Sequence, residues 1–122
     1  MGAARVLIVD RDADSRNVYR IMLEHHGFEV VEASDGERAV EIAIASMPAI
    51  VVTELTLAQM DGHALLARLK ADPATAEVCV IVLTARALRE DRERSVGAGC
   101  AAFLTKPIEP QALVREINRL IQ

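Results

Sequence analysis

Four polar residues stand at the ends of strongly apolar segments, and together they have the side chains that charge-based chemistry needs. They are Asp10, Glu54, Thr84 and Lys106. One polar residue at the end of an apolar run is ordinary, since polar groups belong at such ends. Two carboxylates gathered with a hydroxyl and an ammonium indicate a functional site instead. The elements that carry these residues decide whether the four can meet.

Short apolar runs alternate along the chain with segments of helical periodicity. The runs are typical of strands buried on both faces, because they are continuously apolar rather than alternating. Strands are predicted at 5–10, 29–33, 49–54, 78–84 and 101–105. Helices are predicted at 15–26, 37–46, 63–71 and 87–97, with a last one that has Pro110 in its first turn.

Five strand–helix alternations predict an α/β fold with three layers, a (βα)5 arrangement around a five-stranded parallel sheet. Right-handed crossovers favour the flavodoxin-like strand order 2-1-3-4-5. A length of 122 residues suits one domain, 1–122. Sites in such sheets lie at the carboxyl ends of the strands, near the point between strands one and three. That rule brings the four polar residues to one edge.

The composition excludes several classes of function. A net charge of −4 and a pI near 5.3 argue against a nucleic-acid surface. No apolar run reaches the roughly 18 residues of a membrane span, and 1–5 lacks the order of a signal peptide. We therefore expect a cytoplasmic protein without direct nucleic-acid or membrane contacts. Cys79 and Cys100 lie in apolar stretches and are predicted to be reduced thiols.

The order of several segments resembles the bacterial two-component response-regulator receiver domain. The resemblance covers nearly the whole chain. The segments are Val6-Leu7-Ile8-Val9-Asp10, the stretch 23–30, the stretch 54–62, Ile81-Val82-Leu83-Thr84-Ala85, and Lys106-Pro107. Each segment alone is weak, but all five in order are specific to the family.

The resemblance implies a phosphorylation pocket that is altered at two positions. Receivers carry an adjacent pair of acids after the first strand, and this pair is Asp10-Arg11 here. The phosphoacceptor of the family is an aspartate that ends the third strand, and Glu54 stands at that position. The resemblance therefore identifies an atypical receiver, or pseudo-receiver, with glutamate in place of the acceptor.

Other residues match the family's pattern more closely. Thr84 and Lys106 match the residues that contact the phosphoryl group, and Phe103 matches the aromatic switch residue that moves with Thr84. Phe103 lacks a hydroxyl, so we expect it to be held inward. The bond before Pro107 is expected to be cis, as is usual in the family. The family's Pro-Gly pair after the acceptor is replaced by Ala58-Gln59.

The substitution at Arg11 bears on the metal ion of the family. A guanidinium removes an oxygen ligand and adds a fixed positive charge. We therefore expect no metal and no cofactor, with Arg11 in the space of the ion and forked onto Glu54 or Asp10. If Mg²⁺ binding is retained, the ligands would be Asp10, Glu54 and the carbonyl of Thr56.

Residues outside the pocket carry weaker signals. Asp12 could replace a metal ligand, but acids at this position more often start a helix, and Asp14 or Ser15 is the predicted cap. His63 begins a helix and is expected to be exposed. The charged run 89–94 is predicted to be a solvated face with paired charges. In the family, the fourth helix, fifth strand and fifth helix form the output or dimer surface; candidates there are Arg89, Arg92 and Phe103.

Three functions remain open from the sequence. The first is a binding module without catalytic residues, which contacts a sensor histidine kinase, a downstream effector or a second copy of itself without normal phosphorylation. The second is a working phosphoacceptor that uses Mg²⁺ and catalyses its own phosphorylation. The third is an engineered phosphomimic, which Arg11 and Ala58-Gln59 disfavour. The fold would also suit a flavin protein, but the phosphate loop and aromatic flanks are missing.

Overall fold

The computed structural model describes residues 3–121, in which strands and helices alternate without exception. The strands are β1 (Arg5–Val9), β2 (Glu29–Ala33), β3 (Ile50–Thr53), β4 (Cys79–Thr84) and β5 (Ala102–Thr105). The helices are α1 (Ala13–His25), α2 (Gly36–Ser46), α3 (Gly62–Ala71), α4 (Arg89–Gly97) and α5 (Pro110–Ile121). Every predicted element is present, and the ends differ from the predicted ones by a residue or two.

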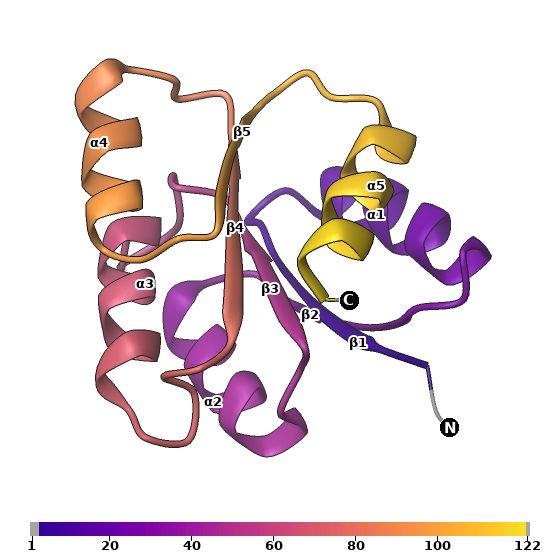
Figure 1. Cartoon of the computed structure of the whole chain (residues 1–122), viewed down its shortest axis with the longest axis horizontal. Helices are drawn as coiled ribbons and strands as arrows, with labels where there is room; N and C mark the ends of the chain where they lie inside the picture. The colour runs from indigo at the N-terminus through magenta and orange to yellow at the C-terminus, as the bar shows by residue number, and fades with distance from the viewer. Residues whose placement is uncertain (1–2, 122) are drawn as a thin grey trace.

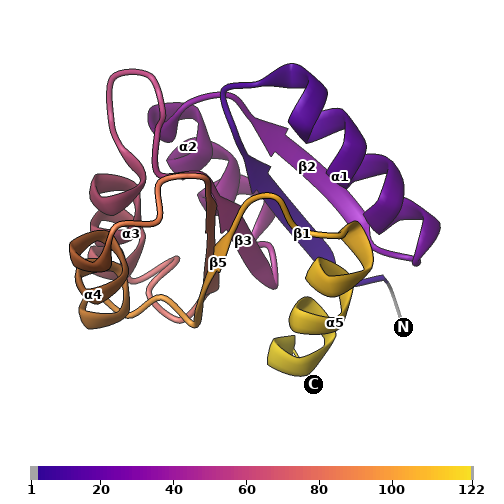
Figure 2. The ribbon, with the colours of Figure 1, turned by 90° about the horizontal axis from the view of Figure 1, so that it is seen from above.

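The strands form one parallel sheet in the order β2-β1-β3-β4-β5, which confirms the predicted flavodoxin-like order. Figures 1 and 2 show the sheet between two groups of helices, with α1 and α5 on one face and α2, α3 and α4 on the other. In the register of the sheet, Val9 pairs with Thr53, and Thr84 pairs with Thr105. The carboxyl ends of all the strands therefore lie at one edge.

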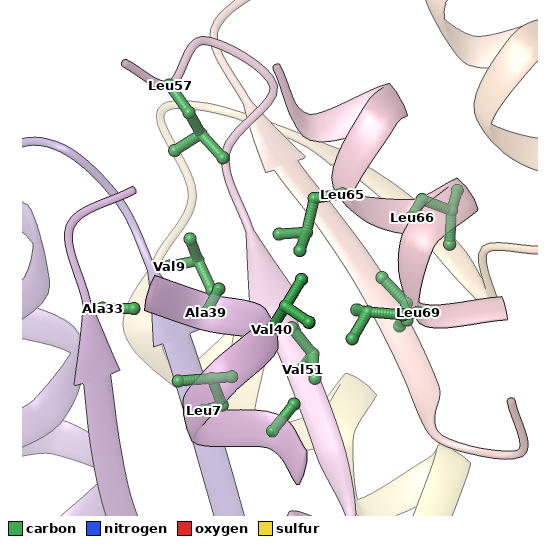
Figure 3. Close-up of a cluster of buried hydrophobic side chains, with 12 residues drawn as sticks. Leu7, Val9, Ala33, Ala39, Val40, Val51, Leu57, Leu65, Leu66 and Leu69 are labelled. Atoms are coloured by element: carbon green, nitrogen blue, oxygen red, sulfur yellow. The ribbon is translucent and has the colours of Figure 1, made fainter. Parts of the chain in front are cut away.

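Alternate residues of each strand face opposite layers. Leu7 and Val9 pack with Leu65, Leu66 and other side chains of α2 and α3, as Figure 3 shows. Val6 and Ile8 face the other way and pack with residues of α1 and α5. Because both faces are covered, the strands read as continuous apolar runs.

Three helices begin at an aspartate whose side chain accepts a hydrogen bond from the first turn. Asp12 caps α1, Asp35 caps α2 and Asp61 caps α3. The prediction of Asp14 or Ser15 as the cap of α1 was wrong by a few residues, since the helix already begins at Ala13. No side chain caps the start of α4 at Leu88.

The two cysteines are free thiols, as predicted. Cys79 packs on the α1 and α5 side of the sheet, whereas Cys100 packs on the opposite side. Burial raises the pKa of both thiols. Among residues 3–121, no helix has the length and apolar character to cross a membrane.

Candidate functional site

The backbone fixes three of the polar residues just past the ends of their strands. The Asp10 amide donates to the Ala33 carbonyl at 3.1 Å, and the Glu54 amide donates to the Val9 carbonyl at 2.9 Å. The Lys106 amide donates to the Thr84 carbonyl at 2.9 Å. Each hydrogen bond continues the sheet ladder by one residue. The sheet therefore positions these side chains at a common edge.

Lys106 joins the two acids of the site. Its Nζ lies 2.8 Å from Asp10 Oδ2 and 2.9 Å from Glu54 Oε2. The side chains of Asp10, Glu54 and Lys106 are 7%, 10% and 20% exposed, so the ion pairs are largely shielded from water. Burial works to lower the pKa of Lys106, but the hydrogen bonds to Asp10 and Glu54 outweigh burial and raise it. The lysine thus stays charged between two carboxylates.

Glu54 is held at both oxygens. Oε2 meets Lys106, while Oε1 accepts hydrogen bonds from the hydroxyl of Thr84 and from the amides of Leu55 (2.9 Å) and Thr56 (3.4 Å). Burial acts to raise the pKa of Glu54, but the hydrogen bond from Thr84 and the ion pair with Lys106 outweigh it, so the pKa is lowered. Glu54 is therefore an anchored carboxylate.

Arg86 is a site residue that sequence reasoning missed. Its amide donates to the Thr84 hydroxyl at 3.0 Å, and its side chain helps line a hollow of about 230 Å³ above the acids. Arg11, Ser15 and Thr56 also line this hollow. The signal available was position: Arg86 lies just past the end of β4, at the same sheet edge as the others.

Arg11 does not take the place expected for it. Its side chain is exposed, and the ion pairs found among residues 3–121 include none between Arg11 and Asp10 or Glu54. The prediction of a guanidinium forked onto these acids was wrong because Lys106 already lies between them. The chain also turns away after Asp10, whose Oδ1 accepts a hydrogen bond from the Asp12 amide at 2.9 Å.

The loop after β3 returns closely to the strand end. A Cβ on Gly62 would lie 2.5 Å from the Glu54 carbonyl oxygen, so only glycine permits this approach. Gln59 adopts a left-handed conformation with φ of 68°, which favours glycine. Gln59 stands where the resemblance places a glycine. The Lys106–Pro107 bond is cis, as expected.

Phe103 is turned inward, as predicted. It is 7% exposed and packs with Leu55 and Val82. The Arg92 guanidinium covers the ring, with its central carbon 4.9 Å from the ring centroid. Arg92 therefore lies between the buried Phe103 ring and the surface that α4 and β5 form. The third candidate for that surface, Arg89, pairs with Glu93 and has a side chain that is 90% exposed.

The prediction that His63 is exposed was wrong. His63 is 3% exposed, and its Nε2 lies 3.1 Å from Oδ1 of Asp91 on α4. Asp91 also binds the Arg86 guanidinium, with distances of 2.9 and 3.2 Å. His63 follows Gly62 at the start of α3, where the sequence gives no sign that α4 will cover it.

Comparisons with known proteins identify the family of this chain. The model of the response regulator receiver domain matches residues 6–118. The phosphate regulon transcriptional regulatory protein PhoB of Escherichia coli is 32% identical over 98% of this chain and 52% of its own length. An uncharacterised 14.6 kDa protein of Leptolyngbya boryana is 33% identical over 93% of this chain and 87% of its own. This chain thus spans about half of PhoB but most of the smaller relative.

Solved structures share the fold. The crystal structure of a CheY-like response regulator receiver domain protein from Methanospirillum hungatei JF-1 has a TM-score of 0.93 and 25% identity, covering 98% of this chain and 94% of that one. Receiver domains are in general signalling modules of two-component systems rather than enzymes. Because the family model matches residues 6–118, which is nearly the whole chain, the chain belongs to the response regulator receiver domain family.

Proposed function

We propose that this receiver module regulates through protein contacts without normal phosphorylation. The observation that carries the proposal is the position of the Glu54 carboxylate. It lies within 2.9 Å of Lys106 and accepts a hydrogen bond from Thr84, the two residues that the resemblance assigns to the phosphoryl group. The acceptor position thus already provides a negative partner for both.

The length of the glutamate supports this function. Its carboxylate stands one methylene farther from the backbone than that of aspartate, nearer to where a phosphoryl oxygen would be. In-line transfer is sensitive to such displacement, with about 1 Å costing on the order of 100-fold in rate. A carboxylate carries less charge and fewer acceptor oxygens than a phosphoryl group, so the imitation is partial. The inward Phe103 agrees with one dominant conformation.

Three features support a site that acts without the Mg²⁺ ion of the family. All four carboxylate oxygens of Asp10 and Glu54 already accept a hydrogen bond or ion pair from the protein. The exposed Arg11 adds a cation at the rim of the hollow. Among residues 3–121, no group of three or more His, Cys, Asp or Glu residues is arranged to hold a metal. The site is therefore proposed to act without Mg²⁺.

The partners that suit this function are proteins. A sensor histidine kinase or a downstream effector would bind the surface of α4, β5 and α5, where Arg89 and Arg92 lie, and a second copy could use the same surface. The net charge of −4 supports the absence of direct nucleic-acid contacts. We place the domain, residues 1–122, in the cytoplasm, where two-component receivers meet their kinases.

A working phosphoacceptor is the second candidate. The hollow above Glu54 is open and about 230 Å³ in volume, and Thr84 and Lys106 are both present. In this reading Asp10, Glu54 and the Thr56 carbonyl would bind Mg²⁺, and the domain would catalyse its own phosphorylation from a donor.

An NMR titration with Mg²⁺ and beryllofluoride, a mimic of an acyl phosphate, separates the two functions. The proposed function predicts no saturable amide shifts at residues 10, 54, 84 and 106, and their recovery in an Arg11→Asp, Glu54→Asp double variant. The matched control is Arg89→Asp, Glu93→Asp, which makes the same changes in an exposed ion pair and should not respond. Saturable shifts in the unaltered protein that require both reagents would favour the second candidate function, a working phosphoacceptor.

A further inference from the structure

Helix α4 is attached to the body of the protein by polar groups. Its buried residues are Asp91 and Ser95, at 8% and 0% exposed, whereas Val96 is 56% exposed. The other helices bury leucine, valine or alanine side chains against the sheet. Since α4 also lacks a capping side chain at Leu88, its position depends on what Asp91 and Ser95 contact.

Asp91 is the centre of these contacts. Its Oδ1 lies 3.1 Å from His63 Nε2 and 2.9 Å from an Arg86 terminal nitrogen, and its Oδ2 accepts from Arg86 Nε at 3.2 Å. The hydrogen bond from Arg86, and to a smaller extent the one from His63, holds the pKa of Asp91 below its ordinary value. Asp91 is thus a carboxylate with donors from α3 and from the loop between β4 and α4.

The charge of Asp91 fixes the hydrogen atoms around His63. A carboxylate only accepts, so His63 Nε2 must donate to it. The other ring nitrogen, Nδ1, lies 3.4 Å from the Ser95 hydroxyl, which donates to it when the ring is neutral. Both ring nitrogens therefore bind α4, one turn apart.

A serine, a histidine and an aspartate in contact could also suggest a hydrolytic triad. Ser95 is 0% exposed and His63 is 3% exposed, so no substrate can reach the hydroxyl in this conformation. The cluster therefore has a structural role.

The cluster continues to the pocket. The Arg86 amide donates to the Thr84 hydroxyl at 3.0 Å, and that hydroxyl donates to Glu54. Arg86 thus binds α4 with its guanidinium and Thr84 with its backbone. An unbroken series of hydrogen bonds leads from His63 through Asp91, Arg86 and Thr84 to Glu54.

We infer that Arg86, Asp91 and His63 form a latch that docks α4 and couples its position to the hydrogen bond between Thr84 and Glu54. Release of the latch frees α4 and lets the Arg86 backbone turn away from Thr84. Because α4 lies on the proposed partner surface, the latch sets whether that surface is ordered. The contacts that dock α4 are made by side chains outside the pocket, so the docking itself does not require phosphorylation of Glu54.

Amide hydrogen exchange of α4 tests the docking. Asp91→Ala should speed exchange at residues 92–98 by about tenfold to a hundredfold, because hydrogen bonds to a charged group are lost. Glu93→Ala is the matched control: it removes an exposed acid from the same helix and should change the rate less than about threefold. Slow exchange at Val51 and Val52, in the buried β3, checks that the variants are folded.

His63→Leu is the second variant, since it keeps an apolar side chain in the buried space. It should speed α4 exchange less than Asp91→Ala, because Arg86 still binds Asp91. Asp91→Ala, which removes the partner of the Arg86 guanidinium, should also shift the amide resonances of Arg86, Leu55 and Thr56, which report on Thr84 and Glu54. Exchange in α4 no faster than in Glu93→Ala would refute the docking. Faster exchange with unmoved resonances at those three residues would refute the coupling. Neither outcome depends on the beryllofluoride result.

Discussion

The pocket and the latch each centre on buried carboxylates that bind cationic or polar side chains, but they are built on different supports. In the pocket, Lys106 lies between Asp10 and Glu54, and the sheet ladder holds the backbone of all three. In the latch, Asp91 lies between His63 and Arg86, and it belongs to a helix without apolar anchors. The first site is positioned by backbone hydrogen bonds. The second positions its own helix.

Because of this difference, the pocket should affect the stability of the whole domain, whereas the latch should affect the mobility of α4. Side chains removed from the pocket leave a sheet that still fixes the strand ends. Side chains removed from the latch leave α4 with the contact between Arg92 and Phe103 but with no buried apolar side chain of its own. We therefore expect pocket variants to lower the free energy of unfolding of the whole domain, and latch variants to act first on α4.

Lys106→Met should have the largest effect, because it leaves Asp10 and Glu54 facing each other without a cation. Removal of one partner from a buried ion pair costs about 3–5 kcal/mol. Urea unfolding should show this loss, while Arg89→Met, in an exposed pair, should stay within about 0.5 kcal/mol. A loss below about 1 kcal/mol in Lys106→Met would show that the pocket is not an anchored cluster.

Glu54→Gln should follow, with a loss of about 1.5–3 kcal/mol at neutral pH from the lost charged hydrogen bonds. The folded pKa of Glu54 lies below its ordinary value of 4.5, so folding favours the carboxylate. Its contribution is present above about pH 4.5 and is lost as the pH falls through the folded value. The two proteins should therefore converge in acid. A difference that persists at low pH would contradict this origin.

His63→Ala should cost about 1–3 kcal/mol, because the Asp91 and Ser95 side chains lose a buried partner. Because the latch holds α4 and not the sheet, thermal unfolding of this variant should show a local transition of α4 before the sheet melts. His63→Leu, which restores apolar volume, is the control and should lose less. A single transition for His63→Ala, coincident in all probes, would mean that α4 and the sheet unfold as one unit.

Arg92→Ala should have the smallest effect, about 0.5–1 kcal/mol, from the lost contact of the guanidinium with the Phe103 ring. Arg92→Lys keeps the charge and should recover part of it. Chemical denaturation of both variants beside Arg94→Ala measures the difference. If Arg92→Ala matches Arg94→Ala, Arg92 does not contribute to holding the ring inward.

The sequence predicted the pocket because it obeys a simple rule. Apolar strands buried on both faces are recognisable by composition, and in a parallel sheet their carboxyl ends meet at one edge. Asp10, Glu54 and Lys106 could therefore be placed together before any contact was known. The hypothesis that Arg11 forks onto these acids was wrong, because the direction of an exposed side chain cannot be derived from its charge and position alone.

The latch could not be predicted in the same way. His63 follows the turn glycine at the start of α3, and Asp91 lies within a run of alternating charges that is typical of a solvated surface. Their contact depends on how α3 and α4 pack, and no periodicity encodes that packing. The buried His63 was the single polar residue inside an otherwise apolar face of α3, a sign that is visible only once the face is known.

The ion pair between Lys106 and Asp10 spans 96 positions of the chain, and this has a consequence for how the protein is made. Asp10 and Glu54 leave the ribosome long before Lys106 does. Until the fifth strand docks, two like charges meet at one edge of the nascent sheet without compensation, and their repulsion opposes early compaction there. Completion of the pocket thus reports that synthesis has passed residue 106. We expect a truncated product that lacks Lys106 to keep two uncompensated carboxylates at this edge and to be less stable for that reason.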